Sequence, residues 1–234
     1  PRPAVSFLNS IESKNKSLRV AYSEDLGITP VDREVRRITR QAAEQFQNAG
    51  AHVDETHPDV SDAYTIFQTL RAQSYAIGMR DLIRDHREAL KPEVIWNTEK
   101  GLALSMADVV HAELARTALM QRVARFFERY DVLLCPATIV PPFPVEERAV
   151  MSCEGKPFET YVDWLLIVAV ATLAGCPALS LPCGFTKEGL PVGLQMIGPA
   201  NGEAKLLAAA HQFEMILDLK TDRPILPRVT HIKS

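Results

Sequence analysis

One run near the carboxyl end, residues 171–214, constrains the fold more than any other part of the chain. It reads ATLAGCPALSLPCGFTKEGLPVGLQMIGPANGEAKLLAAAHQFE. The pattern predicts a strand over 178–184, a turn at Gly189 and a second strand over 191–197. Apolar residues alternate along one face of the second strand: Val192, Leu194 and Met196. A strand, a turn and a second strand are therefore expected in immediate succession.

A helix is expected after this pair. Asn201 is predicted to cap it, because asparagine is among the preferred residues at that position. Apolar residues then recur at helical spacing: Leu206, Ala210, Phe213 and Leu217. The chain therefore returns to cover the sheet with a final amphipathic helix.

The front of the chain predicts a strand, a helix and a second strand. Alternating apolar residues mark the first strand: Leu18, Val20 and Tyr22. Thr29 is expected as the N-cap of the helix with Pro30 at its first position, and Gly50 should end it. A strand beginning at Ala51 would then pair in parallel with the first through a right-handed crossover.

The middle of the chain predicts further helices. Residues 62–90 should form one or two surface helices, interrupted at Pro92. Ser105 with Asp108 predicts the start of another helix. Its buried side is expected to carry Val110, Leu114, Ala118, Val123, Phe126 and Tyr130.

Two apolar segments and a loop complete the predicted layers. Residues 132–135 are expected to form a strand buried on both faces, and the proline-rich segment after it a loop. The apolar run 164–174 is expected to be a buried helix, since it is too short to cross a bilayer. Strands and helices alternate throughout, which predicts an α/β fold, layered α/β/α with a mixed sheet. We expect one α/β domain over residues 1–234.

Composition excludes several classes of partner. The chain is 47% hydrophobic and 24% charged, with a net charge of −3. These values indicate a globular protein without the basic excess that nucleic acid binding requires, so we expect neither nucleic acid nor membrane as a partner. The four cysteines show no CxxC spacing and no zinc pattern, so buried, reduced thiols and a cytoplasmic location are expected.

Two parts of the back half together resemble a known family. YDVLLCPAT at 130–138 and the run 171–214 resemble the C-terminal half of the amidase-signature hydrolases. In the front half, LRVAYSEDLG and TPVDREVRRITRQAAEQFQNAGAHVDE are similar to that family's strand, helix and strand. The resemblance implies hydrolysis of carboxamide C–N bonds through a serine acyl-enzyme, without metal or organic cofactor. It also implies that the lysine, the cis-serine and the nucleophilic serine lie upstream of this chain.

No catalytic residue is assigned within the chain. Amide hydrolysis needs an activated nucleophile and donors around the oxyanion, which a Gly-rich turn commonly supplies. None of the 11 glycines is adjacent to another, and no Gly-x-Ser-x-Gly pattern occurs. Neither Ser180 nor Lys205 is assigned a catalytic role. The chain is therefore predicted to be inactive alone, as the C-terminal portion of an amidase.

Four residues are candidates for the substrate pocket: Thr138, Ile139, Trp164 and Gln195. Each also has a purely structural interpretation. Thr138 can satisfy a turn, Trp164 can belong to the core, and a buried glutamine commonly bonds to backbone.

The histidines do not predict a metal site. His52 and His57 flank Asp54 and Glu55, but alternation along a strand splits these groups between two faces. His211 is expected to be a solvated residue of the last helix. We therefore assign no metal ligands.

The expected partners follow from the resemblance. A small amide would bind the intact enzyme, and the missing N-terminal half, or a second copy through self-association, would cover surface left apolar here. Two alternatives stay open: a non-catalytic partner subunit of a split enzyme, and a small-molecule-binding module derived from an amidase.

Overall fold

The computed structural model describes residues 6–11 and 17–217, and its centre is a five-stranded mixed sheet. The strand order is β2-β1-β3-β7-β6. The strands are β1 (Arg19–Tyr22), β2 (His52–Glu55), β3 (Val132–Pro136), β6 (Ala178–Phe185) and β7 (Pro191–Ile197). A separate hairpin pairs β4 (Ser152–Cys153) with β5 (Lys156–Pro157).

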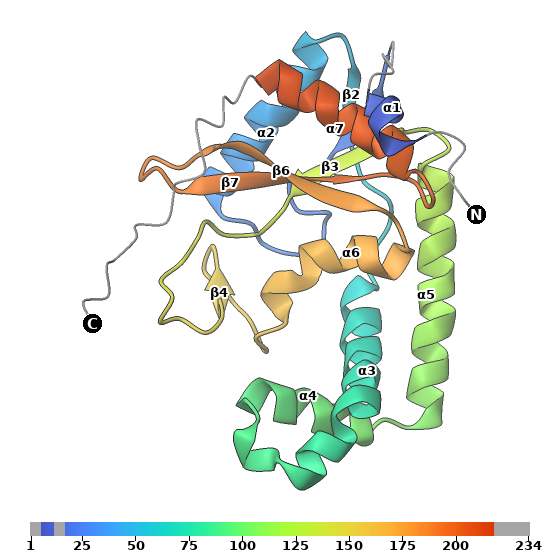
Figure 1. Ribbon diagram of the computed structural model, residues 1–234, viewed down its shortest axis with the longest axis vertical. Coiled ribbons are helices and arrows are strands. Elements are labelled where there is room, and N and C mark those ends of the chain that lie inside the picture. The colour runs from blue at the N-terminus through green and yellow to red at the C-terminus, as the bar shows by residue number, and fades with distance from the viewer. Residues whose placement is uncertain (1–5, 12–16, 218–234) are drawn as a thin grey trace, which may run out of the picture.

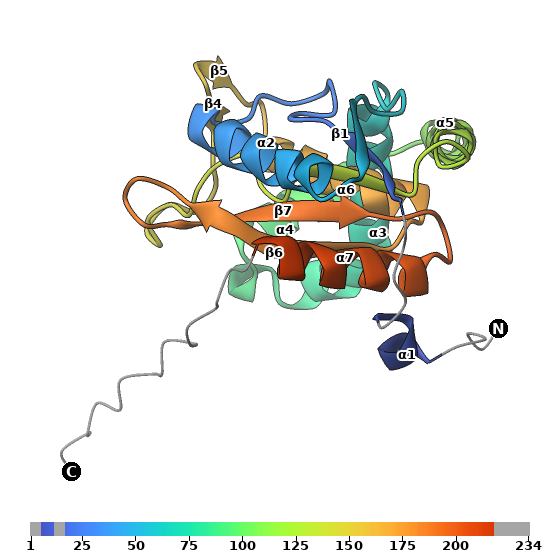
Figure 2. The same cartoon turned by 90° about the horizontal axis from the view of Figure 1, so that it is seen from above.

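Helices lie on both sides of this sheet. They are α1 (Phe7–Ile11), α2 (Arg33–Asn48), α3 (Ala63–Asp85), α4 (Pro92–Leu102), α5 (Met106–Phe126), α6 (Leu166–Ala174) and α7 (Glu203–Leu217), with 3-10 turns η1 (Arg87–Ala89) and η2 (Asp163–Leu165). Figure 1 shows α2 and α7 over one face and α6 with α3 beyond the other, and Figure 2 shows the same layers from above. The predicted layered α/β fold is confirmed.

The register explains why the sheet is mixed. β1 pairs in parallel with β2 and with β3, whereas β7 is antiparallel to both β3 and β6. The predicted parallel unit at the front is confirmed, and the two strands predicted at the back form an antiparallel pair. They meet at β3, which lies between β1 and β7.

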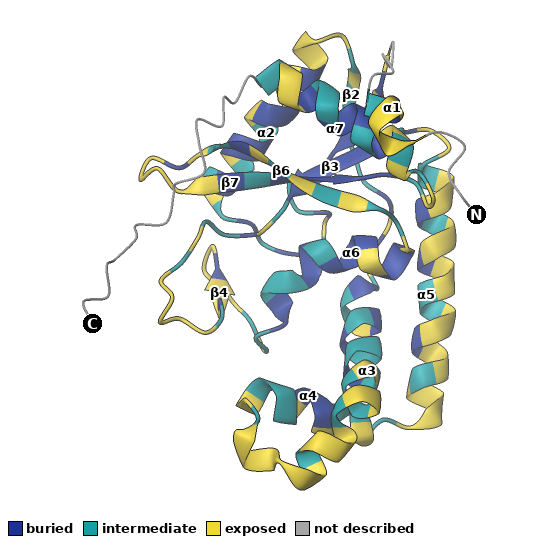
Figure 3. Cartoon of the chain, in the orientation of Figure 1, coloured by how far each residue is buried: buried dark blue, intermediate teal, exposed yellow. Residues whose placement is uncertain are grey.

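The core is centred on β3. Every residue of this strand is buried, as expected for a strand covered on both faces. Phe46 of α2 and Phe213 of α7 stack with their ring centroids 4.8 Å apart, which joins the two helices over the sheet. Figure 3 shows burial concentrated in the sheet and exposure increasing toward the far ends of α3, α4 and α5.

The start of α2 differs from the prediction. The helix begins at Arg33, and its N-cap is Asp32, whose Oδ1 accepts hydrogen bonds from Glu34 N at 2.8 Å and Val35 N at 3.1 Å. Thr29 and Pro30 therefore lie in the preceding loop. The predicted end is correct, since the helix stops at Asn48 just before Gly50, whose φ is 92°.

The buried face predicted for α5 is partly wrong. The helix does start with a capping box between Ser105 and Asp108. However, Val110 is 47% exposed and Leu114 is 64% exposed. The residues that α5 buries are Ala112, Leu119 and Val123. Through these buried residues α5 packs along α3 and α6. Val110 and Leu114 belong to a second apolar line on α5, which faces outward.

Two further helices lie close to their predicted positions, with small differences. The apolar run forms η2 and then α6, which ends at Gly175 with φ 65°. The last helix starts at Glu203, two residues beyond Asn201, which has φ 60° and is not its cap. Within the part of the chain that the structure describes, no helix has the length and apolar character needed to cross a membrane.

The crossing of α3 and α4 predicts the effect of one substitution. A Cβ at Gly101 would lie 1.9 Å from Ala72 O and 2.8 Å from Ala76 Cβ, so Gly101→Ala requires the helices to separate. We expect a net loss of about 1–3 kcal/mol in the free energy of unfolding, measured by urea denaturation, because overpacking exceeds the gain in helix propensity.

Gly78→Ala is the matched control for this prediction. Gly78 also lies inside a helix, and a Cβ there would have no neighbour within 4 Å. We expect this substitution to raise the free energy of unfolding by up to about 1 kcal/mol. Equal effects of the two substitutions would contradict the close contact between α3 and α4.

Candidate functional site

The carboxyl ends of β1 and β3 lie side by side, and the loops that leave them are candidate binding loops. Tyr22 is opposite Leu134 in the parallel pair. β2 lies on the other side of β1, so the strand order reverses between β1 and β3. In open α/β sheets, ligands bind outside the carboxyl ends of the strands at such a reversal. The candidate site therefore comprises loops 23–32 and 137–151.

The loop after β1 is held in one conformation. Ser23 Oγ accepts a hydrogen bond from Leu26 N at 3.0 Å, and Asp25 Oδ1 accepts one from Gly27 N at 2.7 Å. Leu26 and Gly27 both have positive φ, at 53° and 69°. The left-handed backbone costs about 1–2 kcal/mol at a leucine, which the complete burial of Leu26 offsets. At Gly27 a Cβ would lie 2.9 Å from His57 Cε1, so this position requires glycine.

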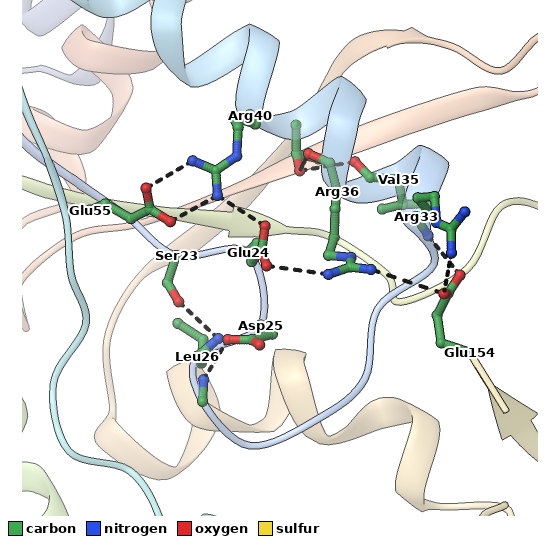
Figure 4. Close-up of polar contacts among 12 residues, drawn as sticks. Ser23, Glu24, Asp25, Leu26, Arg33, Val35, Arg36, Arg40, Glu55 and Glu154 are labelled. Carbon is green, nitrogen blue, oxygen red and sulfur yellow. Dashed lines mark hydrogen bonds and ion pairs between the residues drawn. The ribbon is translucent and has the colours of Figure 1, made fainter. Parts of the chain in front are cut away.

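A network of ion pairs ties this loop to α2 and to the β4–β5 hairpin. Figure 4 shows Arg40 between Glu24 and Glu55, at 3.0 and 2.8 Å, and Arg36 between Glu24 and Glu154, at 3.3 and 4.0 Å. The Arg40 guanidinium lowers the pKa of the Glu55 carboxyl. Each carboxylate in this network already has a cationic partner. The network therefore orders the loop and the hairpin rather than presenting a free acid or base.

The loop after β3 contains two of the predicted pocket residues. Thr138 is exposed, and its Oγ1 donates a hydrogen bond to Val140 O at 2.6 Å. Ile139 is completely buried, and its carbonyl accepts hydrogen bonds from Asp32 N at 2.8 Å and from Cys153 Sγ at 3.8 Å. Thr138 thus faces the surface of the loop, whereas Ile139 anchors the loop to α2 and the hairpin.

Trp164 supports the same loop from another element. It lies in η2, is half-buried, and packs edge to face against Phe143 with the ring centroids 5.6 Å apart. Phe143 belongs to the proline-rich loop that also carries Thr138. Sequence reasoning did not select Phe143, although an aromatic residue among prolines was a visible signal.

Gln195 lies in the sheet close to this loop. It pairs with Cys135 on one side and with Ser180 on the other, so these three side chains share one face of the sheet. Its Nε2 donates a hydrogen bond to Cys135 Sγ at 3.2 Å. Ala137 N donates to Gly193 O at 3.0 Å, so the residue before Thr138 is bonded to β7 two residues away from Gln195.

The face of β6 beside Gln195 is open. Ala178, Ser180 and Pro182 are exposed, and their side chains alternate with those of the half-buried residues of the opposite face. At Gly193, a Cβ would lie 2.7 Å from Ser180 Oγ and 3.1 Å from Ala137 Cβ. Glycine at this position therefore lets Ser180 and Ala137 approach the strand without a clash.

In the described part of the chain, none of the four cysteine thiols is hydrogen-bonded to a base. Burial raises the pKa of the Cys135 and Cys183 thiols to about 12 and of the Cys153 and Cys176 thiols to about 11, so all four stay protonated at neutral pH. His211 is 42% exposed and faces Glu214. No group of three potential metal-ligating side chains occurs in residues 6–11 and 17–217.

Curated relatives resemble nearly the whole chain. A glutamyl-tRNA(Gln) amidotransferase subunit from Halothermothrix orenii is 30% identical over 96% of this chain and 51% of its own length. The protein of the same name from Synechococcus sp. is 39% identical over 97% of this chain and 51% of its own length. The chain thus spans about half the length of the curated relatives it matches.

Solved structures share the fold. A bacterial aryl acylamidase of the amidase signature family superposes with a TM-score of 0.79 at 21% identity, covering 96% of this chain and 50% of that one. The 6-aminohexanoate cyclic dimer hydrolase in complex with substrate gives a TM-score of 0.81 at 20% identity over the same shares. Because the amidase family model matches residues 1–207, the chain belongs to the amidase family.

Proposed function

We propose that this chain is the C-terminal portion of an amidase that hydrolyses carboxamide C–N bonds through a serine acyl-enzyme. The observation that carries the proposal is the match of residues 1–207 to the amidase family. Its position as the C-terminal portion rests on the resemblance of its back half to the end of such enzymes. The proposed contribution of this chain is architectural: it completes the sheet and forms part of the substrate pocket.

The chemistry supports a division between this portion and a catalytic portion. The reaction requires a hydroxyl nucleophile, a base and oxyanion donors in one place. Ser180 is exposed on β6, but its neighbours in the sheet are Gln195 and Gly193, neither of which is a base. We therefore propose that the chain has no catalytic activity by itself.

The proposed pocket wall combines the end of β3 and β7 with the loop after β3. Thr138 and Gln195 lie at this end, and Trp164 holds Phe143 of the same loop. Ile139 would act through its position in the core, since its side chain is completely buried. A small amide substrate would bind against this wall in the intact enzyme, with no metal or organic cofactor.

The proposed surface for the remaining half, or for a second copy, lies along α5. Apolar and uncharged residues follow its outer side at helical spacing: Met106, Val110, Leu114, Thr117, Ala118 and Gln121. This outer stripe leads to a mainly apolar groove of about 530 Å³ between α5, the end of α6 and the loop before α7. Such a continuous apolar surface is unusual for a monomer.

Domain organisation and location complete the proposal. The described core is continuous from Leu18 to Phe213, which supports a single domain. Of the four unpaired cysteines, three are buried and Cys176 is half-buried, which supports reduced thiols and a cytoplasmic location. The net charge of −3 favours neither nucleic acid nor an anionic membrane as a partner.

The purified chain should not hydrolyse amides. We expect no ammonia release from simple aliphatic or aryl amides above the level of buffer alone, and no labelling by a fluorophosphonate probe. The physical reason is that Gln195 and Gly193, which neighbour Ser180 in the sheet, cannot take its proton. Turnover that disappears in Ser180→Ala would overturn this part of the proposal.

The purified chain should associate through α5. We expect a light-scattering mass above 26.0 kDa that rises with protein concentration. Val110→Glu with Leu114→Glu should return the mass to that of the monomer, because charges on the outer stripe would be desolvated on association.

Val145→Glu is the matched control for this experiment, since Val145 is 91% exposed and lies away from α5. This control should leave the mass of the assembly unchanged. A mass of 26.0 kDa for the unmodified chain at every concentration would argue against association.

A further inference from the structure

Arg71 of α3 is surrounded by aromatic rings instead of carboxylates. Its Cζ lies 5.0 Å from the ring centroid of Tyr75, 5.9 Å from that of Phe67 and 6.0 Å from that of Tyr161. Phe67 and Tyr75 are one helical turn before and after Arg71, and Tyr161 comes from the segment that precedes α6. We call Arg71 and these three rings the arginine cage.

The guanidinium in this cage has unused donors. Its Nη2 donates to Tyr75 Oη at 3.2 Å and to Tyr161 Oη at 3.3 Å. Its Nε is buried without a hydrogen-bond partner. Throughout residues 17–217, Nη1 has no hydrogen-bond partner and no carboxylate lies within ion-pair distance of Arg71. By contrast, Arg122 forms an ion pair with Asp62 at 2.5 Å.

The phenol groups add donors to the same place. Tyr161 Oη accepts from Arg71 and also from Asn97 Nδ2. The orientation of the Asn97 amide is fixed, because Nδ2 also donates to Glu93 O at 2.9 Å. With two bonds accepted, the Tyr161 hydroxyl still has one proton that it can donate to a further acceptor. Tyr75 also accepts from Arg71, and its proton is free to be donated.

The neighbouring carboxylate cannot serve as this acceptor. Asp163 already accepts bonds from Glu159 N at 2.9 Å, from Thr160 N at 3.1 Å, from Thr160 Oγ1, and from Gln68 Nε2 at 3.3 Å. Gln68 Oε1 in turn accepts from Lys100 Nζ at 2.8 Å, and burial lowers the pKa of Lys100. Asp163, Gln68 and Lys100 therefore form one hydrogen-bonded network, and among the described residues Arg71 makes no bond to it.

The donors of the cage define the chemistry of a group that it would bind. Such a group accepts hydrogen bonds from a guanidinium and from phenols, which a carboxylate does with its two oxygens. One unpaired guanidinium matches a single negative charge better than the double charge of a phosphate. A neutral amide oxygen would leave the guanidinium without a counter-ion.

We propose that the arginine cage binds the carboxylate of a small-molecule ligand, so that the amide substrates of the intact enzyme carry a carboxylate. The cage lies near the proposed pocket wall, since Tyr161 is three residues before Trp164, which contacts the loop of Thr138. The assignment to a substrate rests on the proposed function. The binding of a carboxylate does not, and is measured separately.

NMR of the arginine side chains tests this binding on the 234-residue chain without any turnover. The chain labelled with ¹⁵N-arginine is titrated with propionate and, in parallel, with propionamide, which has a similar shape but no charge. The Nε–H signal of Arg71, identified by its loss in Arg71→Lys, should shift saturably with propionate and not with propionamide. An exposed residue, Arg125, provides the internal reference.

Two variants distinguish recognition from a structural role. Tyr161→Phe keeps the ring but removes the hydroxyl, which accepts from Arg71 and Asn97 and would donate to the ligand. This variant should weaken propionate binding about tenfold, as expected for a hydrogen bond to a charged group. Arg125→Lys should leave the affinity unchanged.

The possible results separate this inference from the proposed function. An Arg71 signal that follows both ligands alike, or that shifts no more than that of Arg125, overturns the inference whatever the ammonia assay shows. Saturable binding of propionate supports the inference even if the chain proves to belong to no active amidase.

Discussion

The pairing of β3 between β1 and β7 is the constraint on which the other features depend. β3 is buried along its whole length, so its backbone groups must be satisfied by neighbouring strands. The ladder continues beyond the strands, with Asp131 N bonded to Arg19 O at 2.7 Å and Ser23 N to Leu134 O at 3.0 Å. This pairing brings together the loops after β1 and β3. One bond, from Asp32 N to Ile139 O at 2.8 Å, then locks the two loops to each other.

The bond from Asp32 N to Ile139 O also shows why one part of the prediction from the sequence was wrong. Strands and helices follow local periodicity, and their existence and type were predicted along most of the chain. The N-cap of α2 was misplaced because Thr29 and Pro30 satisfy the local rule for a helix start. The loop nevertheless continues to Asp32, where a contact with Ile139, distant in sequence, fixes the backbone. A single sequence carries no local signal for that contact.

Burial was predicted less well than secondary structure, for a related reason. A helical stripe reports that a face is apolar, but it does not identify what covers that face. On α5 the line of Val110 and Leu114 is as apolar as the line of Leu119 and Val123, and only the second one faces the core. Ile139, predicted beside a pocket from its place after a strand, has a completely buried side chain, and its role in a pocket stays a prediction. Only part of the arginine cage could be predicted from the sequence. Phe67 and Tyr75 flank Arg71 at helical spacing, whereas Tyr161 is 90 residues away from Arg71.

The segment 158–165 connects the arginine cage to the proposed pocket wall. The buried carboxylate of Asp163 orients it by accepting hydrogen bonds from the backbone of Glu159 and Thr160 and from Gln68 of α3. Tyr161 then completes the cage, and Trp164, in the same turn, holds Phe143. A buried polar network of this kind fixes position rather than adding stability, because a well-packed apolar cluster could replace it at little energetic cost. Its presence at this junction is explained if the placement of Tyr161 and Trp164 relative to each other matters for the ligand.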